Sequence, residues 1–392
     1  MIPMDKPDNI IYMDHAATTP CIPEAVNEMM PFLTDNYGNP AAIYGIARSA
    51  ARAVRGARAD VAASISADAS EIIFTSGGSE ADDQAVFSAF SEDTGAIQGG
   101  HIIISPIEHH AVLNSAMALK KRGVKVTLLP VDENGVVDPD DVIKAIRPDT
   151  KLISVMLANN EIGTIEPVSE IGRISRERGI LFHTDAVQAF GHIPIDVNAM
   201  NIDILSASGH KMGAPKGIGF NYIRNGIRIN PLIYGGSQER GLRAGTLNVP
   251  GIVALGTASG ITCDHLREHM SYVKNLRDML IDRIFASIPD VKLNGHKIDR
   301  LPGNVSISFA GIESETLLIL LDRENICASG GSACSTGALE PSHVLKAIGL
   351  DDARSSGTVR FSLSYTNTES EIDTVVQVLS EKVGYLRNLR MI

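Results

Sequence analysis

Between residues 71 and 223 the chain alternates short apolar segments with amphipathic ones, and this alternation constrains the fold more than any other feature. The apolar segments are five to seven residues long and rich in β-branched residues, as in EIIFT (71–75), HIIIS (101–105) and KLISVML (151–157). Most are followed by a longer stretch with helical character. Strands that alternate with helices indicate an α/β protein whose largely parallel or mixed sheet is covered by helices on both faces.

The expected elements of this first part follow from the pattern. Strands are predicted at residues 71–75, 101–105, 125–130, 151–157, 180–184, 202–207 and 219–223. Helices are predicted at residues 79–90, 110–122, 138–146 and 170–178.

The pattern changes near residue 260. Apolar residues from Leu266 to Ile288 recur every three or four positions, which predicts one long amphipathic helix from about Cys263 to Ile288, ended by Pro289. Beyond it we expect strands at 304–309 and 359–364, and helices at 314–323 and 369–389. The C-terminal third therefore has the pattern of a small α+β domain, which the long helix joins to the first.

Charge and hydropathy exclude several classes of protein. The chain of 392 residues carries 35 Lys and Arg against 46 Asp and Glu, a formal charge of −11. This acidic balance argues against a sequence-independent nucleic-acid binder, which needs a basic face. No apolar run reaches the roughly 18 residues of a membrane-spanning helix. The first residues lack the pattern of a signal peptide, so we expect a cytoplasmic (cytosolic) protein.

The four cysteines, Cys21, Cys263, Cys327 and Cys334, form no C-x-x-C pair and predict neither a disulfide framework nor a zinc site; no metal site is expected. We expect Cys263 to be buried on its helix. Cys334 lies in a loop of small residues, GGSACSTG (330–337), where a thiol is expected to be accessible. An accessible thiol near cationic groups is a ready nucleophile, although an ordinary loop cysteine stays open.

Two further segments have the composition of a ligand site. The turn TSGGSE (75–80) joins a strand to a helix, where glycines, free backbone N–H groups and the Ser79 hydroxyl suit a phosphate. Many strand-to-helix turns share that composition, so this signal is weak alone. Lys211, in SASGHKMGAPKG (206–217), leaves a strand into a loop, where a confined lysine can form a Schiff base. A solvated surface lysine is the simpler alternative.

Four more side chains are candidates for a ligand site. Asp185 ends an apolar strand, at the edge of a parallel sheet where ligands bind, and it is also a candidate helix cap. His109 and His110 follow the strand HIIIS, where a ring can stack on a flat ligand, cap a helix or lie in the core. Arg360, inside the apolar strand TVRFSLS, needs a carboxylate partner, either from the protein or from a substrate.

Taken in order, these motifs resemble the cysteine desulfurases of the NifS/IscS type, pyridoxal-phosphate enzymes of the class-V aminotransferase family. The resemblance runs from YMDHAATTP at Tyr12 to VRFSLS at Val359, through NNEIG (159–163), GGSQERGLRAGT (235–246) and GSACSTGALEPSHVL (331–345). It implies the PLP-dependent transferase fold of type I: a large domain with a mainly parallel seven-stranded sheet between helices, and a small α+β C-terminal domain. Residues 15–260 would form the large domain. Residues 1–14 and 261–392 would form the small one, which carries the cysteine loop at about 326–340.

The resemblance also implies a role for each matching position. Lys211 matches the lysine that holds the cofactor, Asp185 the acid that pairs with its ring nitrogen, and His109 the histidine that stacks on the ring. Cys334 matches the nucleophile. The other matches are Gln188 and Asn160 near the ring oxygen; Gly78, Ser79, Ser208 and His210 at the phosphate; Thr246 at the phosphate from the other subunit; and Asn160, Arg360 and Asn39 at or near the substrate carboxylate.

The implied reaction converts L-cysteine into L-alanine. Lys211 moves the α-proton, and the thiolate of Cys334 takes the sulfur as a persulfide. The persulfide is then passed to an acceptor protein for iron–sulfur cluster, thio-cofactor or thiolated-tRNA synthesis. The implied partners are L-cysteine, a second copy of the chain and the acceptor, with no membrane and no direct nucleic acid. The GSACSTG context resembles the long-loop group rather than the SufS-like group.

Two alternatives stay open. A selenocysteine lyase or another class-V aminotransferase would share the fold, and an aminotransferase would not need Cys334. A non-catalytic scaffold homologue would bind no cofactor. The chain also departs from the family pattern at SEADD (79–83), AAIY (41–44) and ASGG (328–331). Asp82 and Asp83 would repel a phosphate if they pointed toward it, whereas in the first turns of a helix they suit its dipole.

Overall fold

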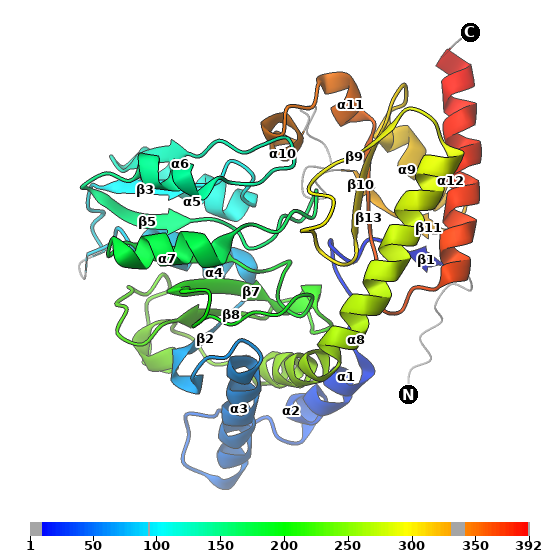
Figure 1. Ribbon diagram of the computed structural model, residues 1–392. Helices are drawn as coiled ribbons and strands as arrows, with labels where there is room; N and C mark the ends of the chain where they lie inside the picture. The colour runs from blue at the N-terminus through cyan, green and yellow to red at the C-terminus, as the bar shows by residue number, and fades with distance from the viewer. Residues whose placement is uncertain (1–9, 93–94, 331–341, 391–392) are drawn as a thin grey trace.

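The computed structural model describes residues 10–92, 95–330 and 342–390, and its largest element is a seven-stranded sheet (Figure 1). The strand order is β2 (Ile72–Thr75), β8 (Gly219–Ile223), β7 (Ile204–Ser208), β6 (Leu181–Asp185), β5 (Thr150–Ser154), β3 (His101–Ile104) and β4 (Lys125–Leu128). Strand β8 runs antiparallel to both β2 and β7, and the other neighbours pair in parallel. The predicted α/β class with a mainly parallel sheet is therefore confirmed.

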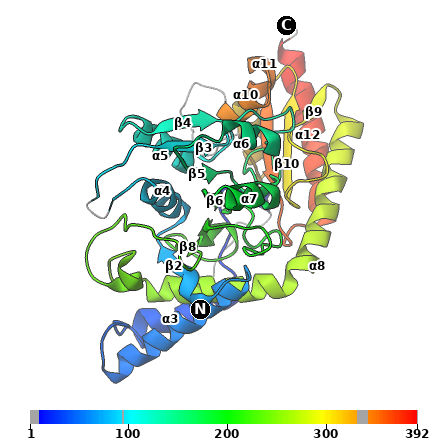
Figure 2. The same ribbon diagram turned by 60° about the vertical axis from the view of Figure 1, so that its left-hand side comes forward.

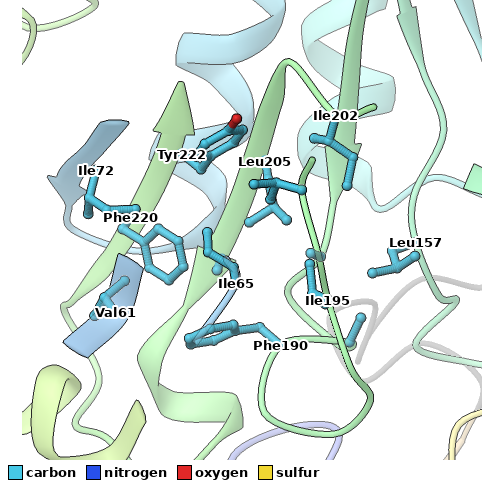
Figure 3. Packing of buried hydrophobic residues seen from close by; sticks show 14 of the residues in the cluster. Val61, Ile65, Ile72, Leu157, Phe190, Ile195, Ile202, Leu205, Phe220 and Tyr222 are labelled. Carbon is cyan, nitrogen blue, oxygen red and sulfur yellow. The ribbon is translucent and has the colours of Figure 1, made fainter. Parts of the chain in front are cut away.

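Helices cover both faces of this sheet because successive residues of a strand point to opposite sides. In β3, Ile102 and Ile104 pack with helices α4 (Gly78–Ser88) and α5 (His110–Lys120). Ile103, between them, belongs to the cluster under α6 (Pro139–Ala145) and α7 (Val168–Glu177). Figure 3 shows part of this second cluster, where the rings of Phe190 and Phe220 meet edge to face at 5.0 Å.

Helix α8 (Val249–Ser287) runs beneath the large sheet and then along the C-terminal part (Figure 2). It begins at Val249, well before the predicted start at Cys263. The Asn248 side chain caps it by accepting a hydrogen bond from Gly251 N at 3.1 Å, and Pro250 lies in the first turn. Residues 249–256 are nearly all buried, so this half of the helix has no polar stripe and no amphipathic period to recognise.

The C-terminal part has its own antiparallel sheet, in the order β12 (Ser329–Gly330), β13 (Thr358–Ser362), β10 (Asn304–Phe309) and β9 (Val291–Leu293). Helices α9 (Ser314–Asp322) and α12 (Glu369–Arg390) pack with it around a separate apolar core. The N-terminal strand β1 (Ile11–Tyr12) pairs with β11 (Ile326–Cys327) and places Met13 in that same core. The domain boundaries given above stay a prediction.

The sequence pattern did not predict the short strands β1, β9, β11 and β12. It also missed the helices α1 (Pro23–Met29), α2 (Pro31–Thr34), α3 (Gly45–Ala63), α10 (His343–Ala347) and α11 (Asp352–Ser356), and the 3₁₀ turns Ala69–Glu71, Gly209–Lys211 and Gln238–Gly241. Cys263 is exposed, so its predicted burial is wrong. At that point α8 passes between the two cores, and its residues 263–265 are covered by neither. Within the described ranges, no helix is long and apolar enough to cross a membrane.

Candidate active site

A pocket of about 380 Å³ opens where β6 and β7 end and α4 begins. This is the carboxyl edge of the parallel strands, where ligands of α/β proteins bind. The chain segments that meet there are far apart in sequence. Ten of the residues singled out from the sequence line this pocket: Gly78, Ser79, His109, Asn160, Asp185, Gln188, Ser208, His210, Lys211 and Arg360.

The N-terminus of α4 forms one wall, and glycines allow its close approach to the neighbouring strands. A Cβ on Gly219 of β8 would lie 2.8 Å from the Cα of Gly77, so that contact needs a glycine. A Cβ on Gly78 would lie 2.7 Å from Cγ2 of Val187. Gly78 and Ser79 of the first helical turn line the pocket together with Ser208, and a helix N-terminus with two hydroxyls is a donor set suited to an anion.

Lys211 lies in the 3₁₀ turn that follows β7, and its amine holds the N-terminal segment. Its Nζ donates to the carbonyl oxygens of Ala16 and Ala17, each at 2.7 Å. Gln188 Nε2 also donates to Ala16 O, at 2.9 Å. Lys211 is thus an internal pocket residue and not the solvated surface lysine of the simpler alternative.

Asp185 ends β6 with its side chain in the pocket and is only 3% exposed. Its Oδ1 accepts a hydrogen bond from Val187 N at 2.8 Å. Burial raises the pKa of Asp185 to about 6, against the lowering effects of that hydrogen bond and of the Lys211 charge. A buried carboxyl of this kind can pair with a protonated ring nitrogen.

The two histidines expected at the site are neutral near pH 7. His109 caps α5, since its Nδ1 accepts from Ala111 N at 3.2 Å, and it also lines the pocket, so the capping and ligand alternatives both hold. Burial lowers the pKa of His109 to about 4, and the pKa of His210 to about 4 as well. His210 Nδ1 lies 3.2 Å from Thr18 Oγ1.

Arg360 reaches the pocket from β13 of the C-terminal part and is 1% exposed. Its Nη2 pairs with Oδ1 of Asp14 at 2.9 Å, and its Nη1 donates to Asn160 O at 3.0 Å. Its Nε is buried and has no partner among the described residues. The protein carboxylate expected from the sequence is therefore Asp14, and a further donor stays open for a second carboxylate.

Two expected site residues, Asn39 and Thr246, do not line this pocket, and a third lies where the structure gives no description. Asn39 is exposed, and its Oδ1 accepts from the nearby Ala41 N at 3.0 Å. Thr246 is also exposed and does not line the pocket. Cys334 lies outside the described residues. The roles expected for all three stay predictions.

The pocket also contains acids that sequence reasoning did not assign. Asp82 and Glu108 are buried in its wall. Glu161 accepts a hydrogen bond from Ser342 Oγ at 2.6 Å, and burial raises the pKa of Glu161 to about 7. The sequence contained only weak signals for these acids. Asp82 follows Ser79 by three residues, about one helical turn. Glu108 and Glu161 are each next to a residue already predicted at the site.

These features together define an α/β protein with a lysine, a buried acid and an anion cradle in one pocket. A sequence profile of the aminotransferase class-V family matches residues 11–375. The chain belongs to this family, whose members use pyridoxal phosphate. Within it, the chain groups with the cysteine desulfurases of the IscS/NifS type.

Individual relatives agree with this assignment. The chain is 50% identical to the cysteine desulfurase IscS of Clostridium botulinum over 382 residues, which cover 97% of this chain and 96% of the relative. It is also 50% identical to IscS of Methanosarcina thermophila over 380 residues, covering 97% and 93% of the two chains. A solved NifS-like protein superposes with a TM-score of 0.90 at 37% identity, covering 96% of this chain and all of that one.

Proposed function

We propose that this chain is a pyridoxal-phosphate-dependent cysteine desulfurase that converts L-cysteine into L-alanine and collects the sulfur on Cys334. One observation carries the proposal: Lys211, Asp185 and Arg360, from three distant parts of the sequence, converge on one pocket. An amine, a buried acid and a carboxylate-binding cation are what a pyridoxal enzyme acting on an amino acid requires.

The residues present fit pyridoxal phosphate. The cradle at Gly78, which a Cβ would fill, offers helix N–H groups and the Ser79 hydroxyl, and Ser208 and His210 lie beside it for the phosphate. Asp185 would hold the ring nitrogen, and Gln188 and Asn160 the ring oxygen. His109, uncharged because its pKa is about 4, would cover a ring face without repelling the protonated nitrogen. The cavity is large enough for a small ligand.

When bound, the cofactor would withdraw electrons from the substrate's Cα and so weaken the bonds around it. The Nζ of Lys211, already in the pocket, would take the α-proton and return one during turnover. Asp185 would keep the ring nitrogen protonated. Arg360 would bind the α-carboxylate through its open Nε while Asp14 and the carbonyl of Asn160 hold the guanidinium in place.

Sulfur transfer would then fall to Cys334. Its thiolate would attack the substrate sulfur, so that the Cβ–S bond breaks, an S–S bond forms and the alanine carbon takes a proton. The persulfide would pass to an acceptor protein for iron–sulfur cluster, thio-cofactor or tRNA-thiolation chemistry. A homodimer would let Thr246 reach the phosphate of the other subunit, and its exposure in the single chain is compatible with that role.

The division into a large part (15–260) and a small part (1–14 and 261–392) belongs to the same proposal, because it would separate the cofactor cradle from Arg360 and Cys334. The two apolar cores support it, since Met13 shares the core of the C-terminal sheet. The cytoplasmic location of the protein stays a prediction.

Alanine formation tests the proposal. The purified protein, loaded with pyridoxal phosphate, is incubated with L-cysteine and a thiol reductant beside its Cys334→Ala and Lys211→Ala variants. We expect alanine from the wild type alone. Full activity of Cys334→Ala would favour an aminotransferase, and turnover of L-selenocysteine without turnover of L-cysteine would favour a selenocysteine lyase. A wild type that takes up no cofactor would favour a scaffold.

A further inference from the structure

Asp82 is a buried acid in the pocket wall that the proposed reaction does not use. It follows Ser79 by three residues and Gly78 by four, so helical spacing places it one turn below the anion cradle on the same face of α4. It is 1% exposed and lines the pocket with Asp185. The next residue, Asp83, does not line the pocket and hydrogen-bonds to the hydroxyl of Ser115 on α5.

The carboxyl group of Asp82 lacks a compensating charge. Its Oδ1 is buried and has no hydrogen-bond partner among the described residues. Among the described residues, His183 is the basic side chain within ion-pair distance of Asp82, with its Nε2 3.7 Å from Oδ1. A buried, ionised carboxylate without a cation to balance its charge is costly. The charge state of His183 therefore decides that of Asp82.

Burial keeps the His183 ring neutral near pH 7. The ring is fully buried on β6, with Nδ1 2.8 Å from Ser154 Oγ and Nε2 2.9 Å from Ser206 Oγ. Ser206 Oγ donates to Asn221 Oδ1 at 3.2 Å, so it accepts from the Nε2–H of His183. Burial lowers the pKa of His183 to about 3. The ring proton is thus directed to Ser206, and His183 offers no positive charge to Asp82.

Two other carboxyls share this end of the pocket. Asp185 on β6 has a backbone N–H donor and the charge of Lys211 to stabilise its ionised form. Glu108, after β3, accepts from Met156 N at 2.7 Å through Oε1, and its buried Oε2 has no described partner. Burial first, and then the charge of Asp185, raises the pKa of Asp82; Glu108 and Asp83 add to this, and the Ser206 hydroxyl opposes it. Carboxylates that share a buried site do not all ionise.

We propose that Asp82 is a positioning residue that stays protonated, so that Asp185 is the single ionised carboxylate facing the ring nitrogen of the cofactor. The inference rests on the proposed function for the role of Asp185. If Asp82 were ionised instead, its charge would draw a proton onto Asp185, and Asp185 could no longer hold the ring nitrogen as an ion pair. Asp82 thus acts on the cofactor through Asp185 and not by contact.

The first test needs no cofactor. A carboxyl that stays protonated in the folded state and ionises in the unfolded state loses stability as pH rises above its unfolded pKa of about 4. Asp82→Asn removes that loss and keeps the shape. We expect this variant of the cofactor-free chain to melt increasingly above the wild type as pH rises from 4 to 7.5. Asp264→Asn, which changes an exposed carboxylate on α8, is the control that subtracts the general effect of removing one acidic group.

A wild type that melts above Asp82→Asn at neutral pH, with the gap closing toward pH 4, would overturn the proposal, because it would mean an ionised and stabilising Asp82. Asp82→Ser, also neutral, is measured alongside in case the asparagine variant does not fold.

The second test uses the holoenzyme. The pH midpoint of the bound cofactor's absorbance is compared between the wild type and Asp82→Asn. Replacing a protonated acid by an amide changes no charge, so we expect the midpoint to stay in place. Removing an ionised carboxylate near the ring would lower it by about one unit or more, and that result would contradict the proposal. If the wild type takes up no cofactor, the proposed function fails, whereas the melting comparison still decides the protonation of Asp82.

Discussion

The ion pair between Asp14 and Arg360 gives a prediction that joins stability to substrate binding. Asp14 lies in the N-terminal segment, and Arg360 lies in β13 near the other end of the chain. Their side chains are 17% and 1% exposed, with Nη2 2.9 Å from Oδ1. The perturbation is Asp14→Ala, which removes the counter-ion and leaves the guanidinium its hydrogen bond to Asn160 O.

The structure sets the expected magnitude. Removing one partner of a buried ion pair costs about 3–5 kcal/mol, because the remaining charge is left uncompensated. Since Asp14 is partly exposed and water can reach the vacated space, we expect the lower end, about 3 kcal/mol. The guanidinium keeps its hydrogen bond to Asn160 O but is less firmly oriented, so the KM for L-cysteine rises by about tenfold, equivalent to about 1.4 kcal/mol. The kcat changes less, since Lys211 and Asp185 are untouched.

Urea unfolding followed by circular dichroism measures the first effect, and the initial rate of alanine formation measures the second. Asp373→Ala is the matched control, because Asp373 pairs with Arg283 on the surface, where the side chains are 64% and 32% exposed. That exposed pair is worth about 0–1 kcal/mol. The reasoning is refuted if Asp14→Ala loses no more stability than Asp373→Ala and its KM equals that of the wild type.

Two further predictions follow from the same pocket. Gly78→Ala places a Cβ 2.7 Å from Val187 Cγ2 in the cradle, so the dissociation constant of pyridoxal phosphate, titrated by absorbance, rises at least about tenfold; an unchanged constant contradicts the cradle assignment. His183, with its pKa lowered from 6.5 to about 3, costs stability as pH falls through that range, since the unfolded chain takes up the proton first. His183→Gln therefore loses less unfolding free energy than the wild type between pH 6.5 and 4. An equal loss in the two proteins would mean that the His183 ring is charged in the folded state and would contradict the prediction.

How much of the fold was predictable depended on whether the pattern had a period. The strands β3 and β6 lie within a residue of their predicted ends because each is a short apolar run bounded by polar residues. The antiparallel direction of β8 left no trace in its own sequence, since direction follows from connections and not from composition. The first half of α8 was missed because a helix buried all round shows no amphipathic period.

The site residues also differed in how far the sequence could predict them. Lys211, Asp185 and Arg360 were recognisable because each is an unusual residue type for its local context. Asp82 was recognised as a departure, but its meaning depends on His183 and Asp185, which are about a hundred residues away and adjacent only in the fold. Ala16 and Ala17 contribute carbonyl oxygens to Lys211, and an alanine gives no chemical sign of such a contact.

The measurement that tests the central claim most directly is the mass of the peptide that carries Cys334 after the holoenzyme has reacted with L-cysteine and excess thiol has been removed. The account predicts one additional sulfur atom on Cys334, formed together with alanine and absent when Lys211→Ala is treated in the same way. Alanine formed by the wild type without added sulfur on Cys334, and at the same rate by Cys334→Ala, would contradict it.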